Sequence, residues 1–243
     1  MFSAAEILRV TDHRPWKLPS GPWIMRQRWS DLLFAHWPIS VEQLRPLVPE
    51  MLELDTFEGR VYMSITPFIL CVQPRGFPPL SQFPEMNCRT YVRFRGKPGI
   101  FFFSLDAASR LAVWGARTFY RLPYFYSRMS AVHRGEKIEY SSRRLSQTAL
   151  FKAEYQPQGP VFNAELGTIQ HWLSERYCLY TTSGGQVYRG EIHHVPWPLQ
   201  EASCRIAENS VAAAAGIQLS ETPPLLNFAR KLDVLIWPLR KAR

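Results

Sequence analysis

The sequence predicts a mainly β protein of the α+β class, with one antiparallel sheet and a few short helices. Short runs of aromatic and β-branched residues recur along the chain, and clusters of Pro, Gly and Ser separate them, which is typical of strands joined by turns. No linker, low-complexity tract or repeat divides the 243 residues, and this length suits one domain with a substantial core. We therefore expect a single domain over residues 1–243, with an N-terminal arm over about residues 1–22.

The first half of the chain is expected to be mostly strands. Ser40 and Gln43 have the spacing of a capping box, which predicts a short helix that ends by Pro49. In chain order we expect one or two strands over 23–37, this helix, a strand over 60–72, a proline-rich loop over 75–84, a hairpin over 85–106 and an amphipathic helix over 107–120.

The second half continues the same pattern. Thr168 is a candidate N-cap, and Gly184-Gly185 is a hairpin signal. We expect strands over 125–132, 137–144, 149–156, 177–182, 186–194, 202–208 and 232–236, and helices over 169–176 and 210–215.

The hairpin over 85–106 is the most informative segment. Its first strand alternates, with Glu85, Asn87, Arg89, Tyr91 and Arg93 on one face and apolar or small residues on the other. Its second strand, 100–106, is apolar on both faces at its start, and such strands lie in protein interiors. We therefore expect the charged face to line an enclosed, partly wet cavity. A solvated sheet face that carries ordinary charges is the alternative.

Register sharpens this expectation. If the hairpin loop comprises the four residues 96–99, Arg93 pairs with Phe102 and Arg89 pairs with Asp106. Directly opposed residues share a face of the sheet, so Arg89 and Asp106 would form an ion pair. A slip of one residue would turn every side chain the other way, which makes this a sharp prediction.

Charge and composition argue against several classes of protein, including nucleic-acid-binding, membrane and secreted proteins. The formal net charge of +9 comes mostly from scattered arginines, so nucleic acid is a minor alternative and an anionic small molecule is the expected partner. No apolar run approaches the ~20 residues that span a bilayer, and the first residues lack the apolar core of a secretory signal. The four cysteines are widely spaced and form no CxxC pair. We expect a cytoplasmic protein without a membrane partner.

Common catalytic arrangements are missing from the sequence. His193 and His194 are adjacent, so in a strand they point to opposite faces, and we expect no metal. There is no GxSxG nucleophile elbow and no glycine-rich phosphate loop, and we expect no cofactor. Of the lysines, only Lys152 is placed where it could face inward.

A set of polar residues without a nucleophile remains. Arginine and tyrosine suit the binding of a carboxylate in a fixed geometry, and a buried glutamate could act as an acid or base. The candidate ligand-binding residues are His36, Asn87, Arg89, Asp106, Arg117, Tyr120, Glu175 and Arg176, and the candidate catalytic residues are Glu85 and Tyr124. An internal salt-bridge network that only organises the fold is the alternative.

Several motifs in fixed order resemble a known family. LFAHWPI, LELDTFEGRVYMSITPF, PEMNCRTYV, FFSLDA, ARTFYRLPY, LSERYCLY and HHVPWPLQ together resemble the YqjF-like family (DUF2071) of uncharacterised, mostly bacterial proteins. The resemblance runs from about residue 29 to 238. That family is similar in turn to the acetoacetate decarboxylase fold, which implies a single-domain, cone-shaped β-barrel around a small ligand cavity.

The more distant resemblance also bears on mechanism. It implies that Glu85 is the counterpart of the decarboxylases' glutamate and that Arg117 lies near their arginine. Tyr124 stands where their Schiff-base lysine would be, and a phenol cannot form an imine. Two classes of function follow: a protein that binds a small oxo or aromatic acid, or a lysine-independent lyase, hydratase or isomerase. In the second class Glu85 would move protons while Arg117 and Tyr124 stabilise an enolate. The sequence leaves open whether the chain forms a homo-oligomer.

Overall fold

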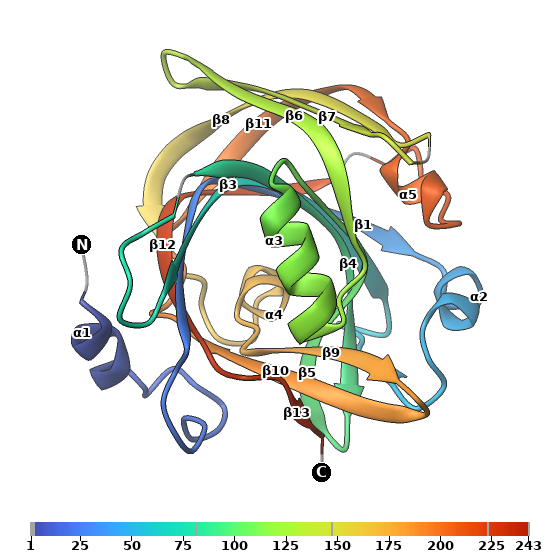
Figure 1. Ribbon diagram of the computed structural model, residues 1–243. Coiled ribbons are helices and arrows are strands. Elements are labelled where there is room, and N and C mark those ends of the chain that lie inside the picture. Colours follow the sequence, from blue (N-terminus) through green and yellow to red (C-terminus); the bar gives the residue numbers. More distant parts are fainter. Residues whose placement is uncertain (1–2, 81, 147, 223, 243) are drawn as a thin grey trace.

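The structure is a computed structural model that describes residues 3–80, 82–146, 148–222 and 224–242. Within these residues thirteen strands form one sheet (Figure 1). The strands are β1 (Met25–Ile39), β2 (Glu53–Leu54), β3 (Val61–Pro74), β4 (Phe83–Phe94), β5 (Lys97–Ala107), β6 (Tyr124–Arg134), β7 (Lys137–Arg144), β8 (Leu150–Phe162), β9 (Cys178–Ser183), β10 (Gln186–His193), β11 (Leu199–Asn209), β12 (Leu225–Ile236) and β13 (Arg240–Lys241).

Short helices connect the strands. They are α1 (Ala4–Arg9), α2 (Val41–Leu44), α3 (Arg110–Gly115), α4 (Ile169–Ser174) and α5 (Val211–Ala214), with a 3-10 turn (Arg45–Leu47) after α2 and a π-helical turn (Ala116–Tyr120) after α3. The expected mainly β fold with few short helices is confirmed. Among the described residues, no helix is long and apolar enough to cross a bilayer.

The sheet closes on itself along two circuits of strands. β5 pairs with β4, and it also makes short parallel contacts with β9 through Ile100 and Phe101 and with β6 from Leu105 onward. β12 pairs with β11 in its middle and with β10 at its end. Both circuits therefore share a wall of five strands: β12, β1, β3, β4 and β5. One circuit is completed by β6, β7, β8 and β11, and the other is completed by β9 and β10. We call these five strands the shared wall.

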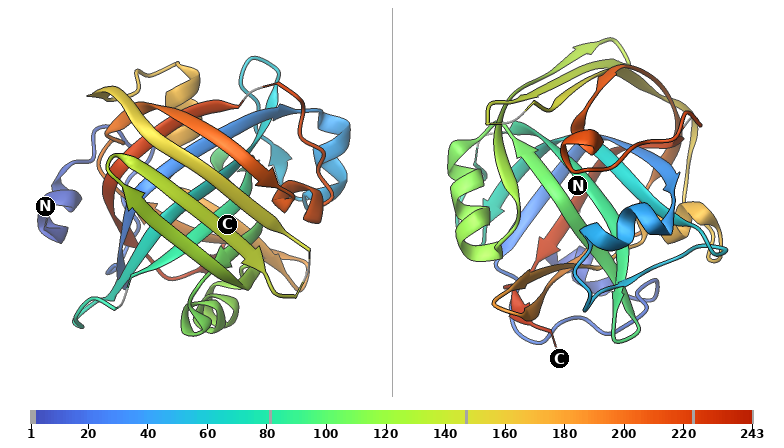
Figure 2. Two further views of the ribbon diagram at one scale, coloured as in Figure 1. Left: turned by 90° about the horizontal axis from the view of Figure 1, so that it is seen from above. Right: turned by 90° about the vertical axis from the view of Figure 1, so that its right-hand side faces the viewer.

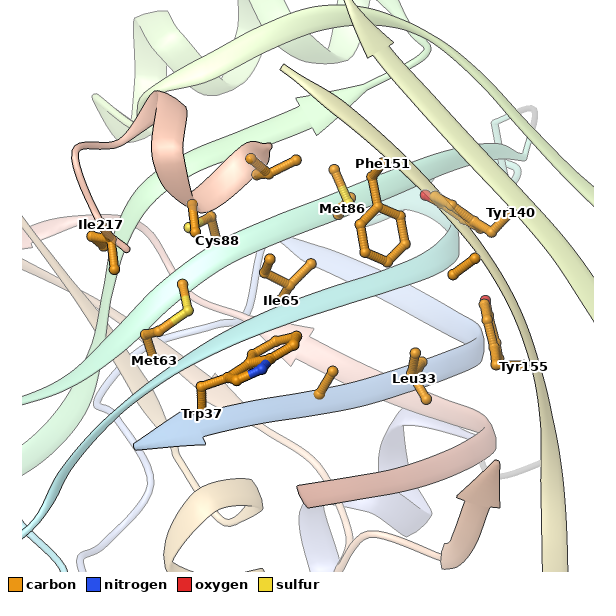
Figure 3. Packing of buried hydrophobic residues seen from close by; sticks show 14 of the residues in the cluster. Leu33, Trp37, Met63, Ile65, Met86, Cys88, Tyr140, Phe151, Tyr155 and Ile217 are labelled. Carbon is orange, nitrogen blue, oxygen red and sulfur yellow. The ribbon is translucent and has the colours of Figure 1, made fainter. Parts of the chain in front are cut away.

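Both faces of the shared wall are buried, which explains why β3 and β4 carry long buried runs. Side chains of the face toward β7 and β8 form a hydrophobic core that Figure 3 shows from close by. Its members include Leu33, Trp37, Met63, Ile65, Met86, Cys88, Tyr140, Phe151, Tyr155 and Ile217. The opposite face forms a second cluster around Phe34, Phe68, Leu105, Trp197 and Val234. This second face carries the cavity described below.

The expected element types are borne out along most of the chain, with changes at the ends. The predicted helix over 107–120 begins later, where the Ser109 side chain accepts a hydrogen bond from the Ala112 backbone N–H. The predicted strand over 232–236 is the end of the longer strand β12. Before β1, the arm carries the helix α1, whose buried Ile7 packs with Leu235 and Trp237.

The predicted register of the β4–β5 hairpin is wrong. Phe94 pairs with Lys97, so the loop has two residues, Arg95 and Gly96, both with positive φ (51° and 76°). A two-residue loop of this kind matches the twist of an antiparallel pair. The ladder also skips Phe103, because Arg89 pairs with Phe102 whereas the next pair is Cys88 with Ser104.

This skipped residue is a β-bulge, and it explains why the predicted Arg89–Asp106 ion pair does not form. An extra residue reverses the alternation of the strand that carries it. Ile100 and Phe102 precede the bulge and line the cavity, whereas Asp106 follows it and lies opposite Met86, on the face of the hydrophobic core.

Candidate functional site

A cavity of about 420 Å³ lies against the second face of the shared wall. Its wall includes side chains of β1, β3, β4 and β5, and also residues of α3 and the end of α4. Figures 1 and 2 show α3 and α4 at opposite ends of the ring of strands. The cavity therefore extends through the interior between these two helices.

Strand β4 supplies three polar side chains to the cavity. Glu85, Asn87 and Arg89 alternate with Met86 and Cys88, which point into the hydrophobic core on the other face. Glu85 is 3% exposed, and Asn87 and Arg89 are each 9% exposed. The structure thus brings these three side chains together in an enclosed space, as the alternation predicts.

Glu85 and Tyr124 form a buried pair. The Tyr124 hydroxyl donates to Glu85 Oε1 over 3.0 Å, and Glu85 Oε2 has no hydrogen-bond partner among the described residues. The pKa of Glu85 is raised to about 8, mainly by burial; the hydrogen bond from Tyr124 opposes this shift, and the charge of Asp106 adds to it. Burial, with the adjacent glutamate, also raises the pKa of Tyr124 well above 10. Both shifts favour the neutral forms of the pair, a carboxylic acid beside a phenol, at neutral pH.

Arg89 is a buried cation without an anionic partner among the described residues. Its guanidinium lies over the rings of Phe34 at 5.5 Å and Tyr91 at 6.0 Å, and its Nε donates to nothing there. Aromatic faces attract a cation, but they do not replace its hydrogen bonds. The pKa of the neighbouring His36 is well below its ordinary value because of burial and the Arg89 charge, so His36 stays neutral and does not add a second charge.

Arg176 and Tyr120 also reach the cavity. Arg176 Nη1 binds Asp55 Oδ2 at 2.5 Å, and its Nε donates to the Trp172 carbonyl, while Nη2 has no partner in the described part of the chain. The Tyr120 hydroxyl donates to the Trp237 carbonyl over 3.2 Å, and burial raises its pKa to about 12. Arg176 is therefore paired with an anion and still has one unpartnered N–H group at the cavity.

The other predicted residues lie outside the cavity wall. Asp106 accepts from both Arg144 Nε (2.8 Å) and Nη2 (2.7 Å) and from Ser127 (2.6 Å), so it belongs to a buried ion pair in the other circuit. Arg117 Nε donates to the Tyr124 carbonyl over 2.7 Å and supports the backbone of that residue. Neither Asp106 nor Arg117 is among the residues that line the cavity.

Glu175 and His36 are likewise engaged elsewhere. Glu175 accepts from the Tyr177 hydroxyl and from the Trp197 backbone N–H. His36 Nδ1 lies 2.6 Å from Ser64 Oγ and 3.1 Å from the Tyr91 hydroxyl, which makes it a hydrogen-bonded core histidine. Both residues support the neighbours of the cavity.

Sequence reasoning missed several polar residues of the cavity wall, among them Thr66, His194 and Trp197. Thr66 lies directly opposite Asn87 on β3, so cross-strand pairing with the polar face of β4 was a signal for it. His194 and Trp197 lie in the loop after β10, where no periodic pattern exists. With the predicted residues they form a set of buried polar atoms that have no protein partner among the described residues: Thr66 Oγ1, Glu85 Oε2, Asn87 Oδ1, Arg89 Nε, Arg176 Nη2, His194 Nε2 and Trp197 Nε1.

Lysine and metal-ligand clusters are not part of the described cavity. Its wall includes no lysine, and Lys152 is exposed on β8, where it binds Glu208. His193 Nε2 lies 2.9 Å from the Ile7 carbonyl, whereas His194 Nδ1 lies 2.8 Å from the Val195 carbonyl. In the described residues no three His, Cys, Asp or Glu side chains gather as a potential metal site.

The ring of strands defines a protein of the acetoacetate decarboxylase-like fold. The chain is similar to acetoacetate decarboxylase from Legionella pneumophila, with a TM-score of 0.65 at 12% identity over 98% of this chain and 95% of that one. It is also similar to the enduracididine biosynthesis enzyme MppR in complex with pyruvate, with a TM-score of 0.62 at 10% identity over 92% of this chain and 91% of that one. At these identities the likeness concerns the fold.

Sequence comparison identifies the family. Residues 26–233 match DUF2071, a family described as an uncharacterized conserved protein. The chain is 52% identical over 229 residues to the uncharacterized protein YqjF of Bacillus subtilis (strain 168), covering 92% of this chain and 95% of that protein. The chain therefore belongs to the DUF2071 family, and the resemblance seen in its motifs is confirmed.

Proposed function

We propose that this protein binds a small organic anion, an oxo or aromatic acid, in the cavity between α3 and α4. Arg89 and Asn87 bind the carboxylate, and the free N–H edge of Arg176 adds a third contact. The observation that carries this proposal is the buried Arg89 guanidinium, which lacks an anionic partner among the described residues. A buried cation without such a partner is costly, and a bound carboxylate would supply the missing charge and hydrogen bonds.

The mode of binding differs from that of an amine catalyst. A Schiff base needs a lysine amine, and no lysine belongs to the described cavity wall. Tyr124 donates a hydrogen bond to Glu85 instead. The complex of MppR with pyruvate has the same fold and supports the choice of oxo acids as the first compounds to test.

The test is a binding screen with a matched variant. We expect 2-oxo, 3-oxo and aromatic carboxylates to raise the melting temperature of the wild-type protein. Arg89→Gln should lose at least tenfold in affinity, since it removes a charge-assisted hydrogen bond to the ligand. Arg205→Gln is the control, because Arg205 is exposed on β11, binds Glu154 at 2.7 Å and does not line the cavity. Equal affinity in wild type and Arg89→Gln would rule out this binding site.

One feature of the site favours a second function, a lyase, hydratase or isomerase that uses Glu85 for proton transfer. The pKa of Glu85, raised to about 8, lies close to physiological pH, where a group can act as both acid and base. Any carboxylate that binds should then be assayed for turnover by wild type and Glu85→Gln. Loss of at least 100-fold in kcat with retained binding supports proton transfer, whereas equal turnover would remove Glu85 from that role.

A further inference from the structure

The unpartnered polar atoms of the cavity wall are buried, whereas the most exposed side chains of the wall are apolar. The residues that carry unpartnered polar atoms are buried, among them Thr66 at 1% exposure and Arg176 at 6%. The lining residues of greatest exposure are Leu111 on α3, Phe119 on the π-helical turn after it and Leu80 in the β3–β4 loop, at 68%, 65% and 47%. Large apolar side chains at the exposed rim are unfavourable in water unless something apolar covers them.

Arg89 is the cation of the described cavity wall that lacks an anionic partner among the described residues. Arg176 binds Asp55 at 2.5 Å, and the partly exposed Arg93, which does not line the cavity, binds the same carboxylate at 2.6 Å. Glu85 is neutral, because its pKa is about 8, and burial also lowers the pKa of His194. The guanidinium of Arg89 remains, with no anionic partner in the described residues. A ligand with a single negative charge neutralises this site, whereas a second carboxylate would meet either neutral polar groups or the apolar rim.

We propose that the ligand is a hydrophobic monocarboxylate, with its carboxylate beside Arg89 and Asn87 and its aliphatic or aryl body directed toward Leu111 and Phe119. This inference rests on the proposed function, and it names the class of acid that the cavity selects. About 420 Å³ exceeds what a three-carbon acid fills, and it lies in the range of cavities that enclose larger ligands. The body of the acid removes apolar surface of the cavity and rim from water.

Calorimetric titration at pH 7 with propionate, hexanoate, octanoate and suberate tests both parts of this assignment. Each methylene that becomes buried should tighten binding by up to about fourfold, so octanoate should bind at least tenfold more tightly than propionate. Suberate has the same number of carbons as octanoate but a carboxylate at each end. It should bind at least tenfold more weakly than octanoate, because its second charge would lie at the apolar rim.

Two leucine variants locate the body of the acid. Leu111→Gln should reduce the ratio of octanoate to propionate affinity by threefold or more, since Leu111 belongs to the rim. Leu166→Gln is the matched control: the same substitution at an 86% exposed leucine that does not line the cavity should leave the ratio unchanged. Equal effects of the two variants would overturn the placement of the apolar body at the rim.

The remaining outcomes separate this inference from the proposed function. Acids that all bind with the same affinity, whatever their length, would overturn the hydrophobic assignment and leave carboxylate binding intact. If suberate binds as tightly as octanoate, the proposal that the ligand carries a single negative charge is overturned. If none of the four acids binds, or if Arg89→Gln binds them as wild type does, carboxylate binding at this site is itself overturned.

Discussion

Two buried arginines on opposite sides of the shared wall differ in what surrounds their guanidinium groups. Arg144 donates to both oxygens of Asp106 and to Ser104, over 2.7 to 2.9 Å. Arg89 faces aromatic rings and the cavity, and no described carboxylate binds it. A buried charge that is fully paired holds a fold in place, whereas one that lacks a partner is more readily explained by a ligand. The same residue type therefore has a structural role on one side of the wall and a candidate binding role on the other.

Asp106→Asn should produce the largest effect, because it removes the charge that balances Arg144. Breaking a buried ion pair from one side costs about 3–5 kcal/mol, since the remaining charge stays buried. We expect the free energy of unfolding to fall by this amount in urea titrations. Arg89→Gln is the counterpart and should change the free energy of unfolding by less than about 1 kcal/mol, or increase it, because it removes an unpaired charge. Comparable losses in the two variants would contradict the distinction between the arginines.

The second prediction concerns Glu85 and pH. Because the fold raises the pKa of this carboxyl from 4.5 to about 8, the folded state holds the proton more tightly than the unfolded state. The stability that Glu85 contributes is therefore full below pH 4.5 and decreases as the pH rises toward 8. Glu85→Gln lacks this dependence, so relative to wild type it should gain on the order of 3 kcal/mol between pH 4.5 and pH 7.

Urea titrations at the two pH values measure this difference, and Glu154→Gln provides the control. Glu154 is partly exposed, and hydrogen bonds from Arg205 and Lys137 lower its pKa. Its contribution to stability is present above pH 4.5 and is lost as the pH falls, so the effect of this variant should have the opposite sign. A Glu85→Gln difference that is the same at pH 4.5 and pH 7 would show that Glu85 has an ordinary pKa in the folded protein.

The sequence predicts the features of these two arginine sites that depend on neighbouring residues, but not those that depend on residues far apart in the chain. Alternation along β4 is a local pattern, and it correctly places Glu85, Asn87 and Arg89 together on one face. The bulge at Phe103 leaves no comparable signal, because Phe101, Phe102 and Phe103 are chemically equivalent in the sequence. The face on which Asp106 lies therefore could not be read from the pattern of β5.

The ion-pair partners that lie far apart in the sequence could not be predicted either. Asp106 and Arg144 are 38 residues apart, and Asp55 reaches Arg176 across 121 residues. His194 and Trp197 enter the cavity from a loop whose path depends on the packing around it. The mainly β fold follows from composition and turn signals, whereas the pairing of charges depends on how the circuits of strands close.

The smallest predicted effect is a change in the pKa of Glu85 when its hydrogen-bond partner in the cavity, Tyr124, is altered. Tyr124→Phe removes the hydroxyl that donates to Glu85, and this hydrogen bond stabilises the charged form of the carboxylate. A single hydrogen bond contributes about 1 kcal/mol, so the pKa of Glu85 should rise by less than about one unit. The shift can be followed by the ¹³C resonance of the Glu85 carboxyl, assigned by its absence in Glu85→Gln. Tyr120→Phe is the control, because Tyr120 also lines the cavity but donates to the Trp237 carbonyl. If both phenylalanine variants shift the resonance equally, the Tyr124 hydroxyl has no specific influence on Glu85.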